Sequence, residues 1–321
     1  MGILMSRGLA RVFFAILSTL LGDACVAQQA EYPSRPVTLI VPFTPGSTVD
    51  ISARTFSREL GQRLRQPFTV ENRPGLVAFR VVKGSAPDGY TLLWHANGST
   101  IAQTVLKEPD FDIRRDFASV ALILRGPLGL FVSADAPYRS VRDLIDDARK
   151  NPGKLNYGSS GVGSMIHLSS ELFKSLGNVN LVHVPYKGGA EAASALMAGQ
   201  IQFLVTDPAS IPRDKSRLLA LASKERSSNL PDIPTVSQAG GPDLEVGFWI
   251  GMFAPAATPR SAIERLNSAS REALRSDAFQ EYIKKYGYIP AWTSPEDMQK
   301  LVTAEVEQWT RIVREAGVPL Q

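Results

Sequence analysis

The fold is decided by one stretch near the start of the chain, Val37-Thr38-Leu39-Ile40-Val41-Pro42-Phe43-Thr44-Pro45-Gly46-Ser47-Thr48-Val49-Asp50. Its first five residues form an apolar, β-branched run that is too short for a helix and typical of a buried strand in a parallel sheet. Pro42 and Pro45 end the strand, and Gly46 lets the backbone turn sharply. Apolar residues then recur at spacings of three and four and predict a helix: Val49, Ala53, Phe56, Leu60 and Leu64.

The turn between this strand and this helix is a candidate anion site. Thr44, Ser47 and Thr48 lie where the helix begins, and the free N–H groups and positive dipole end at such a place attract an anion. The same residues also suit a turn that only caps the helix and binds nothing. The sequence leaves both interpretations open.

Residues 1–27 have the pattern of an export signal. Arg7 and Arg11 give a basic start, residues 12–21 form a short apolar run, and Cys25-Val26-Ala27 offers small residues for cleavage. The apolar run is too short to span a membrane. Cys25 could instead anchor a lipoprotein, although Gly22-Asp23-Ala24 is a poor match before it.

Composition narrows the class of protein. Cys25 is the single cysteine, so cleavage near Ala27 leaves a mature chain without disulfides, thiol catalysis or cysteine-ligated metal. An exported chain without disulfides suits the bacterial periplasm. The net charge of +4 is small, and basic clusters such as Arg63–Arg65 lack the interleaved aromatic residues of a nucleic-acid surface. We therefore expect no nucleic-acid partner.

Strand-like apolar runs alternate with helical patterns along the chain, which predicts an α/β fold with mostly parallel sheets. The further strands expected from these runs are 68–70, 90–94, 121–124, 128–132, 155–157, 181–184, 201–205, 218–221 and 248–253. Helices are expected near 141–148, 165–176, 259–275 and 295–316.

A second candidate loop, Tyr157-Gly158-Ser159-Ser160-Gly161-Val162-Gly163-Ser164, joins a strand to a helix. Its glycines permit close backbone approach, and its serines supply hydroxyl donors. Ligands of open α/β sheets bind beyond the carboxyl ends of strands, and both loops are expected there. This loop fits neither the Gly-x-Ser-x-Gly elbow of serine hydrolases nor a Walker phosphate loop. Plain capping of the following helix remains the alternative.

The three histidines are more simply explained by structure than by chemistry. His167 and Glu171 lie four apart on a predicted helix, but no third metal ligand has a matching spacing, so we expect a surface hydrogen bond between them. His95 and His183 each end a predicted strand and could line a cleft, although a structural role is the simpler interpretation.

Two groups of acidic residues need separate interpretations. Three aspartates at 110, 112 and 116 alternate with phenylalanines, which indicates a packed loop rather than a calcium site. Asp207 follows the strand expected at 201–205, so its carboxylate could accept from a ligand amine or hydroxyl. It could equally cap the next turn.

Many segments, in one order, resemble the tripartite tricarboxylate transporter solute-binding receptors, also called the Bordetella uptake gene family. The segments that carry the resemblance are Val41–Asp50, Glu71–Gly75, Pro87–Leu92, Asn151–Leu155, Gly158–Ser164, His183–Gly189, Leu230–Thr235 and Phe253–Pro255. The similarity runs from about Tyr32 to the end of the chain.

This resemblance implies a type II periplasmic-binding-protein fold, an α/β architecture in which two lobes joined by two crossovers enclose a ligand cleft. One lobe is expected at 28–124 and 247–321, and the other at 125–246. The family binds small carboxylates and delivers them to a membrane permease, without catalysis or a cofactor. We expect the same of this chain, as a monomer with a permease of the tripartite tricarboxylate type as its partner.

Carried over to this chain, the resemblance places a ligand carboxylate between the two loops. The residues expected to bind it are Thr44, Gly46, Ser47 and Thr48 from one lobe and Ser159, Ser160, Gly161, Gly163 and Ser164 from the other, with Asn97, Ser99, Thr206 and Asp207 as further candidates. No metal site is expected.

The chain departs from the family pattern at three places. Ser47 replaces the second glycine of the first loop, and residues 76–80 replace the usual Ala-Gly-Gly-x-x-Gly run. The segment between Asp207 and Leu218 is shortened, and Gln202 stands where aspartate is common. These departures bear on the ligand rather than on the fold.

Two other functions would fit an exported chain of this kind. A sensor subunit that presents its ligand state to a membrane kinase would differ only in its partner. A secreted hydrolase would use Ser159, Ser160 or Ser164, and it would need one of the three histidines as a base near that serine.

Overall fold

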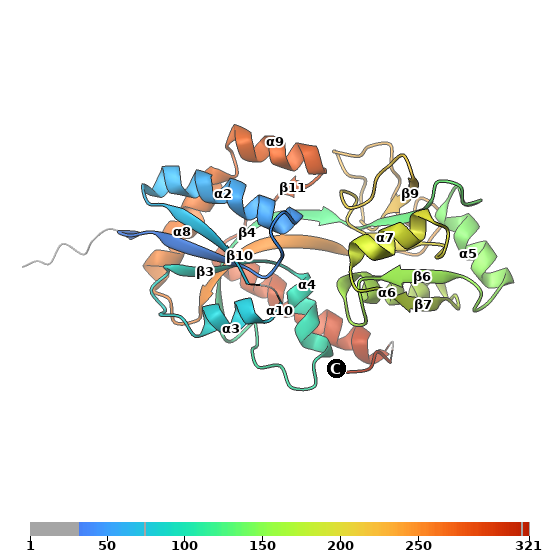
Figure 1. The fold of residues 1–321 in the computed structure, drawn as a ribbon, viewed down its shortest axis with the longest axis horizontal. Helices are drawn as coiled ribbons and strands as arrows, with labels where there is room; N and C mark the ends of the chain where they lie inside the picture. The colour runs from blue at the N-terminus through green and yellow to red at the C-terminus, as the bar shows by residue number, and fades with distance from the viewer. Residues whose placement is uncertain (1–31, 74, 316, 321) are drawn as a thin grey trace, which may run out of the picture.

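The computed structural model describes residues 32–73, 75–315 and 317–320. The export signal predicted at 1–27 lies outside these residues. The elements gather in two groups along the long axis of the molecule (Figure 1). No helix in the described ranges combines the length and the hydropathy needed to cross a membrane.

The first group is built on a six-stranded sheet in the order β11-β4-β10-β3-β1-β2. Its strands are β1 (Val37–Val41), β2 (Phe68–Asn72), β3 (Thr91–Ala96), β4 (Phe117–Pro127), β10 (Gly247–Pro255) and β11 (Ile289–Pro290). β1 pairs in parallel with β2 and β3, as its apolar pattern predicts. β10 is antiparallel to β3 and β4, because the chain enters β10 from the second group of elements.

Helices cover both faces of this sheet. Residues of α2 (Thr48–Leu64), α8 (Arg260–Ala273) and α9 (Asp277–Tyr286) share one buried cluster with Val37, Leu39 and Val41. Ile40 points the other way and packs with α3 (Val77–Lys83) and α10 (Pro295–Glu315). This alternation along β1 is the strand period of two, with both faces buried.

The second group contains two smaller sheets. One has the order β8-β5-β9, and the other pairs β6 with β7 in parallel. The strands are β5 (Gly129–Ser133), β6 (Asn156–Ser159), β7 (Val182–Pro185), β8 (Leu204–Thr206) and β9 (Ser216–Leu221), and the helices are α5 (Val141–Lys150), α6 (Met165–Gly177) and α7 (Gly189–Met197). β5 is antiparallel to both of its neighbours. Together with the antiparallel pairs of β10 and β11 in the first sheet, this shows that the expectation of mostly parallel sheets is wrong.

Two segments connect the groups. The chain passes from β4 directly into β5, and it returns through residues 242–247 into β10 (Figure 1). The lobe borders proposed at 124/125 and 246/247 fall within β4 and at the start of β10. Ile101 of α4 (Gly98–Ala102) and Trp309 of α10 share a buried cluster with Leu130 and Phe203 of the second group. Apolar packing therefore joins the two groups beside the crossing strands.

Candidate functional site

The first loop is arranged around the N-terminus of α2. Ser47 is the N-cap, and its Oγ accepts a hydrogen bond from the backbone N of Asp50 at 3.2 Å. The backbone of Ser47 is extended, with φ −66°, so a serine fits there without strain in place of a glycine. Gly46 has φ +82°, which a glycine adopts readily.

The buried carboxylate of Asp50 holds this loop together. Its Oδ2 accepts from Gly46 N at 2.8 Å and from Arg54 Nε at 3.1 Å, and its Oδ1 accepts from Asn72 Nδ2 at 2.9 Å. Burial raises the pKa of Asp50, but the hydrogen bonds from Arg54, Gly46 and Asn72 outweigh it and hold the pKa below its ordinary value. The N–H of Gly46 is therefore already used within the chain.

The second loop is arranged in the same way around α6. Ser164 is the N-cap, and its Oγ accepts from His167 N at 3.2 Å. The backbone N of Gly163 donates to His167 Nδ1 at 3.0 Å. Ser159 Oγ lies within 3.1 Å of both backbone polar atoms of Gly161 and 2.7 Å from His183 Nε2. Like the first loop, this loop satisfies most of its own polar groups.

Ser159 and His183 form the pair that a serine hydrolase would need. However, Ser159 is fully buried, and its hydroxyl is engaged by the loop backbone. Burial lowers the pKa of His183 to about 4, with a further contribution from the neighbouring His167. These contacts of Ser159 therefore stabilise the loop, and a substrate has no access to the buried hydroxyl.

A cavity of about 590 Å³ lies between the two loops. It is lined from the first group by residues such as Phe43 and Thr48, and from the second by Ser160 and Ser164. The predicted site residues that line it are Thr48, Asn97, Ser160, Gly163, Ser164 and Asp207. Those that do not line it are Thr44, Gly46, Ser47, Ser159, Gly161 and Thr206.

Asn97 lines the cavity, but its side-chain amide is bonded to other residues of the chain. Its Nδ2 donates to Gly247 O at 3.0 Å and to Glu305 Oε1 at 2.7 Å, and its Oδ1 accepts from Trp249 N at 3.3 Å. Trp249 Nε1 donates to Glu305 Oε2 at 2.9 Å. Burial raises the pKa of Glu305 to about 7, against the lowering effect of these donors. The amide of Asn97 therefore has little capacity left for a ligand.

Asp207 contacts the first group of elements across the cavity. It follows β8, and its Oδ2 accepts at 2.9 Å from the hydroxyl of Tyr288, which directly precedes β11. Its Oδ1 accepts from Ala209 N at 3.0 Å. Thr206 is buried beside it, and its hydroxyl lies 3.2 Å from Ser210 Oγ. For Ser99 the structure describes only the backbone, which lies in α4.

Comparison with known proteins then identifies the family. A sequence model of the tripartite tricarboxylate transporter family receptor matches residues 52–318. The chain belongs to this receptor family. Protein BugT of Bordetella pertussis is 31% identical over 326 residues, which cover 99% of each chain.

Solved structures agree with this assignment. Rpa4515 of R. palustris with adipate is 36% identical, with a TM-score of 0.80 over 90% of this chain and 99% of the other. MatC of Rhodopseudomonas palustris with bound malate is 30% identical, with a TM-score of 0.75 over 88% of this chain and 100% of the other. The receptor therefore has the predicted periplasmic-binding-protein fold and is a solute receptor of the Bug type.

Several cavity residues of the receptor were not predicted. They are Pro42, Phe43, Val49, Gly75, Leu76, Ala96, Gly98, Val105, Leu106, Val162, Met165, Phe248, Ile250 and Tyr288. For Leu76 the sequence offered a signal, because this residue begins the segment 76–80 that departs from the family pattern. Most of the others are apolar residues that resemble core positions in the sequence, and nothing local distinguishes a cavity wall from a core.

The remaining polar clusters are structural. Gln202 stands where aspartate is common in the family. Its Oε1 accepts a hydrogen bond from Asn156 N at 2.7 Å. The surface hydrogen bond expected between His167 and Glu171 is wrong: both are buried, and Glu171 instead bonds to Tyr157 and Lys174. The reason is that α6 turns this side toward β6 and β7 and not toward solvent.

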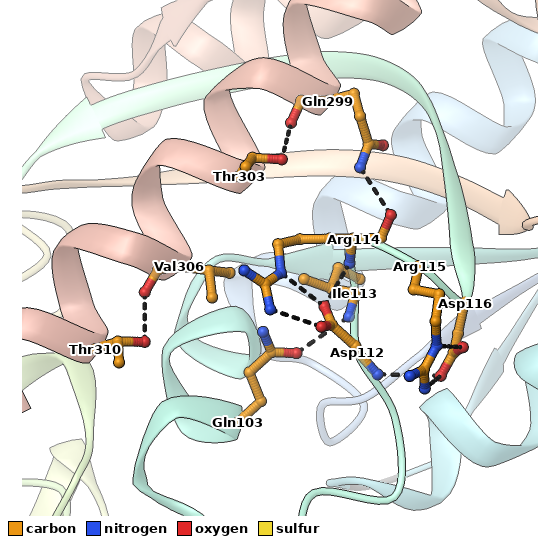
Figure 2. Close-up of polar contacts among 10 residues, drawn as sticks. All are labelled: Gln103, Asp112, Ile113, Arg114, Arg115, Asp116, Gln299, Thr303, Val306 and Thr310. Carbon is orange, nitrogen blue, oxygen red and sulfur yellow. Dashed lines mark hydrogen bonds and ion pairs between the residues drawn. The ribbon is translucent and has the colours of Figure 1, made fainter.

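The aspartates of 110–117 lie in a packed loop, as predicted. Asp112 accepts two hydrogen bonds from the Arg114 guanidinium at 2.9 and 2.7 Å, and Asp116 pairs with Arg115 (Figure 2). Gln299 of α10 donates to Arg114 O at 3.1 Å and holds the loop against the helix. Phe111 stacks on Phe79 with a centroid separation of 4.4 Å. Asp110 pairs with Arg80 of α3, so each of the three carboxylates has a cationic partner.

Proposed function

We propose that this receptor binds a small carboxylate in the cavity between the two loops and delivers it to a membrane permease of the tripartite tricarboxylate type. The observation that carries the proposal is the cavity itself, to which the N-terminal regions of α2 and α6 both contribute. Adipate and malate in the related structures are small carboxylates, which agrees with this ligand class.

The ligand contacts come from the polar groups that the loops leave available. Ser164 Oγ accepts a bond from His167 N, so its own hydrogen remains for a ligand oxygen. Ser160 and Thr48 add two further hydroxyls to the wall. Hydrogen bonds to a charged group contribute about 1.5–3 kcal/mol each, and micromolar affinity corresponds to about −8 kcal/mol. A few such bonds and the helix dipole of α6 therefore suffice without an arginine.

Isothermal titration of the mature chain against succinate, malate, adipate, benzoate and citrate tests the ligand class. Ser160→Asp would place a carboxylate beside the N-terminus of α6 and should weaken binding by about tenfold or more. Ser237→Asp makes the same change at an exposed serine outside the cavity and should leave affinity unchanged. Equal affinities of both variants and the wild type would contradict the proposed site.

Uptake in intact cells tests the partner. Deleting the receptor gene should abolish uptake of the ligand found by titration, and restoring the gene should recover it. Unchanged uptake together with a lost transcriptional response to the ligand would support a kinase-linked sensor instead. Export to the periplasm, which the family suggests, is checked by fractionating cells and sequencing the mature N-terminus.

A further inference from the structure

The charges on the cavity wall are asymmetric. Asp207 is the one carboxylate among the described lining residues, and these residues include no arginine, lysine or histidine. A ligand with two carboxylates would therefore meet a negative charge and no compensating cation. The ligand group that lies beside Asp207 therefore depends on where Asp207 is placed in the cavity.

Asp207 is held as a hydrogen-bond acceptor. Both of its partners, Ala209 N and the Tyr288 hydroxyl, are donors, and each uses one carboxylate oxygen. Burial raises the pKa of Asp207 above its ordinary value, and the hydrogen bonds from Ala209 N and Tyr288 act against that shift. Because both partners are donors, each oxygen keeps a lone pair for a hydrogen from a ligand. Tyr288 is itself buried, and burial raises the pKa of its hydroxyl so that it stays protonated as a donor.

The two helix N-termini at the cavity differ in charge. α2 has Asp50 in its first turn, and the Tyr288 hydroxyl that holds Asp207 also lies beside the Thr48 side chain. The first turn of α6 contains no acidic residue. A ligand carboxylate is therefore drawn toward α6, near Ser160 and Ser164, and repelled from the Asp207 side.

Apolar side chains form most of the remaining wall. They include Phe43, Leu76, Val105, Leu106, Phe248 and Ile250. These groups offer no hydrogen bonds, so a ligand with several hydroxyl or carboxylate groups along its body would lose water without replacement there. An aliphatic or aromatic body would instead gain from burial.

We propose that the ligand has one carboxylate, an apolar body and, at the opposite end, a hydroxyl or ammonium group that donates to Asp207. The inference rests on the proposed function, because it assumes that the cavity binds a carboxylate. It favours a hydroxy or amino carboxylate over a dicarboxylate of the same length. The donor is the shared chemistry, and titration distinguishes its two sources.

Two matched ligand series test this specificity by isothermal titration. The aliphatic series is hexanoate, 6-hydroxyhexanoate, 6-aminohexanoate and adipate. The aromatic series is 4-methylbenzoate, 4-(hydroxymethyl)benzoate, 4-(aminomethyl)benzoate and terephthalate. Within each series only the end group changes, so the affinity ratios report the group that faces Asp207. The proteins are the wild type, Asp207→Asn and the control Asp232→Asn, which removes the same charge from an exposed side chain.

In wild-type protein, the hydroxyl or ammonium member of at least one series should bind about tenfold or more tightly than its methyl and carboxylate counterparts. Asp207→Asn should reduce this preference and improve binding of the dicarboxylate, whereas Asp232→Asn should do neither. The order in the wild type stands as a test even if Asp207→Asn fails to fold.

The proposal is overturned if the dicarboxylate equals the donor-bearing member in the wild type, or if Asp207→Asn folds and leaves the ratios unchanged. It is also overturned if succinate, malate or citrate binds while neither series does, and the proposed function then still stands. Absence of binding by every carboxylate would instead remove the proposed function as well.

Discussion

The imidazole rings of His167 and His183 stack with their centroids 3.9 Å apart, and both contact the second loop. His167 Nδ1 accepts from Gly163 N, so that nitrogen carries no proton in this arrangement. Burial lowers the pKa of both rings, that of His183 to about 4. Two neutral imidazoles therefore shape the loop that lines the cavity.

Acidification should destabilise the receptor through these rings. Their folded pKa values lie below the ordinary histidine value of 6.5, so the unfolded chain binds more protons as the pH falls through and below that value. Their contribution is complete above about pH 6.5 and is lost toward about pH 4. Urea denaturation at a series of pH values should show a smaller acid loss in His183→Gln than in the wild type.

One further histidine must be considered in that comparison. His95 is fully buried, and burial lowers its pKa to about 4, so it acts in the same direction in both proteins. The pH dependence of His183→Gln should consequently shrink without disappearing. An identical acid loss in the variant and the wild type would show that the stacked pair does not carry the effect.

Ser160 and Ser164 of the second loop should respond differently to alanine. Ser160→Ala should weaken carboxylate binding with little change in stability, because this residue lines the cavity and none of the described residues bonds to its hydroxyl. Ser164→Ala should also lower stability by about 1 kcal/mol, since it removes the N-cap of α6. Titration and thermal melts of each variant check this separation.

Ser159→Ala is the matched control for direct contact. Its hydroxyl is buried away from the cavity, so its loss should lower stability by about 1 kcal/mol and affect affinity only through the loop. A larger affinity loss in Ser159→Ala than in Ser160→Ala would contradict the placement of these two side chains.

Gly163 and Val105 form a close contact between the two groups of elements. Gly163 has φ +75°, and a Cβ there would meet Val105 Cγ2 at 2.7 Å. Gly163→Ala should therefore destabilise the receptor more than Gly46→Ala, where φ is +82° and the space is open. Adding Val105→Ala to Gly163→Ala should recover part of the difference in thermal melts. Equal losses at the two glycines would refute the steric argument.

Glu305 should make stability fall as the pH rises. Its folded pKa of about 7 lies above the ordinary glutamate value of 4.5, so the folded state holds the proton more tightly between these values. The slope approaches about 1.4 kcal/mol per pH unit where only the folded state is protonated. Glu305→Gln should remove this slope in urea denaturation between about pH 5 and pH 8. A wild-type slope in the variant would assign the effect to another group.

Much of the fold was readable from local patterns. The β1–α2 unit follows directly from the apolar run, the two prolines and the helical spacing, and the structure confirms it. The antiparallel placement of β10 and β5 was missed, because strand direction depends on where the chain crosses between the two groups and not on the strand's own residues.

The sequence predicted that the two candidate loops face one cavity, but it did not predict the hydrogen-bond partners of their residues. Both loops reach one cavity, but Ser47, Asn97 and Ser159 have hydrogen-bond partners within the chain. A polar residue in a strand–helix turn has the same sequence signature whether it caps the helix or faces a ligand. Tyr288 is distant in sequence and joins Asp207 only through tertiary packing, so no local pattern indicated it.

The central claim is that a carboxylate is held between the two loops. The most direct test is a crystal structure of the receptor with the tightest carboxylate found by titration. We expect the carboxylate oxygens to lie within hydrogen-bonding distance of Ser160 or Ser164, with the rest of the ligand against Phe43 and Leu76. A carboxylate bound outside this cavity would contradict the account.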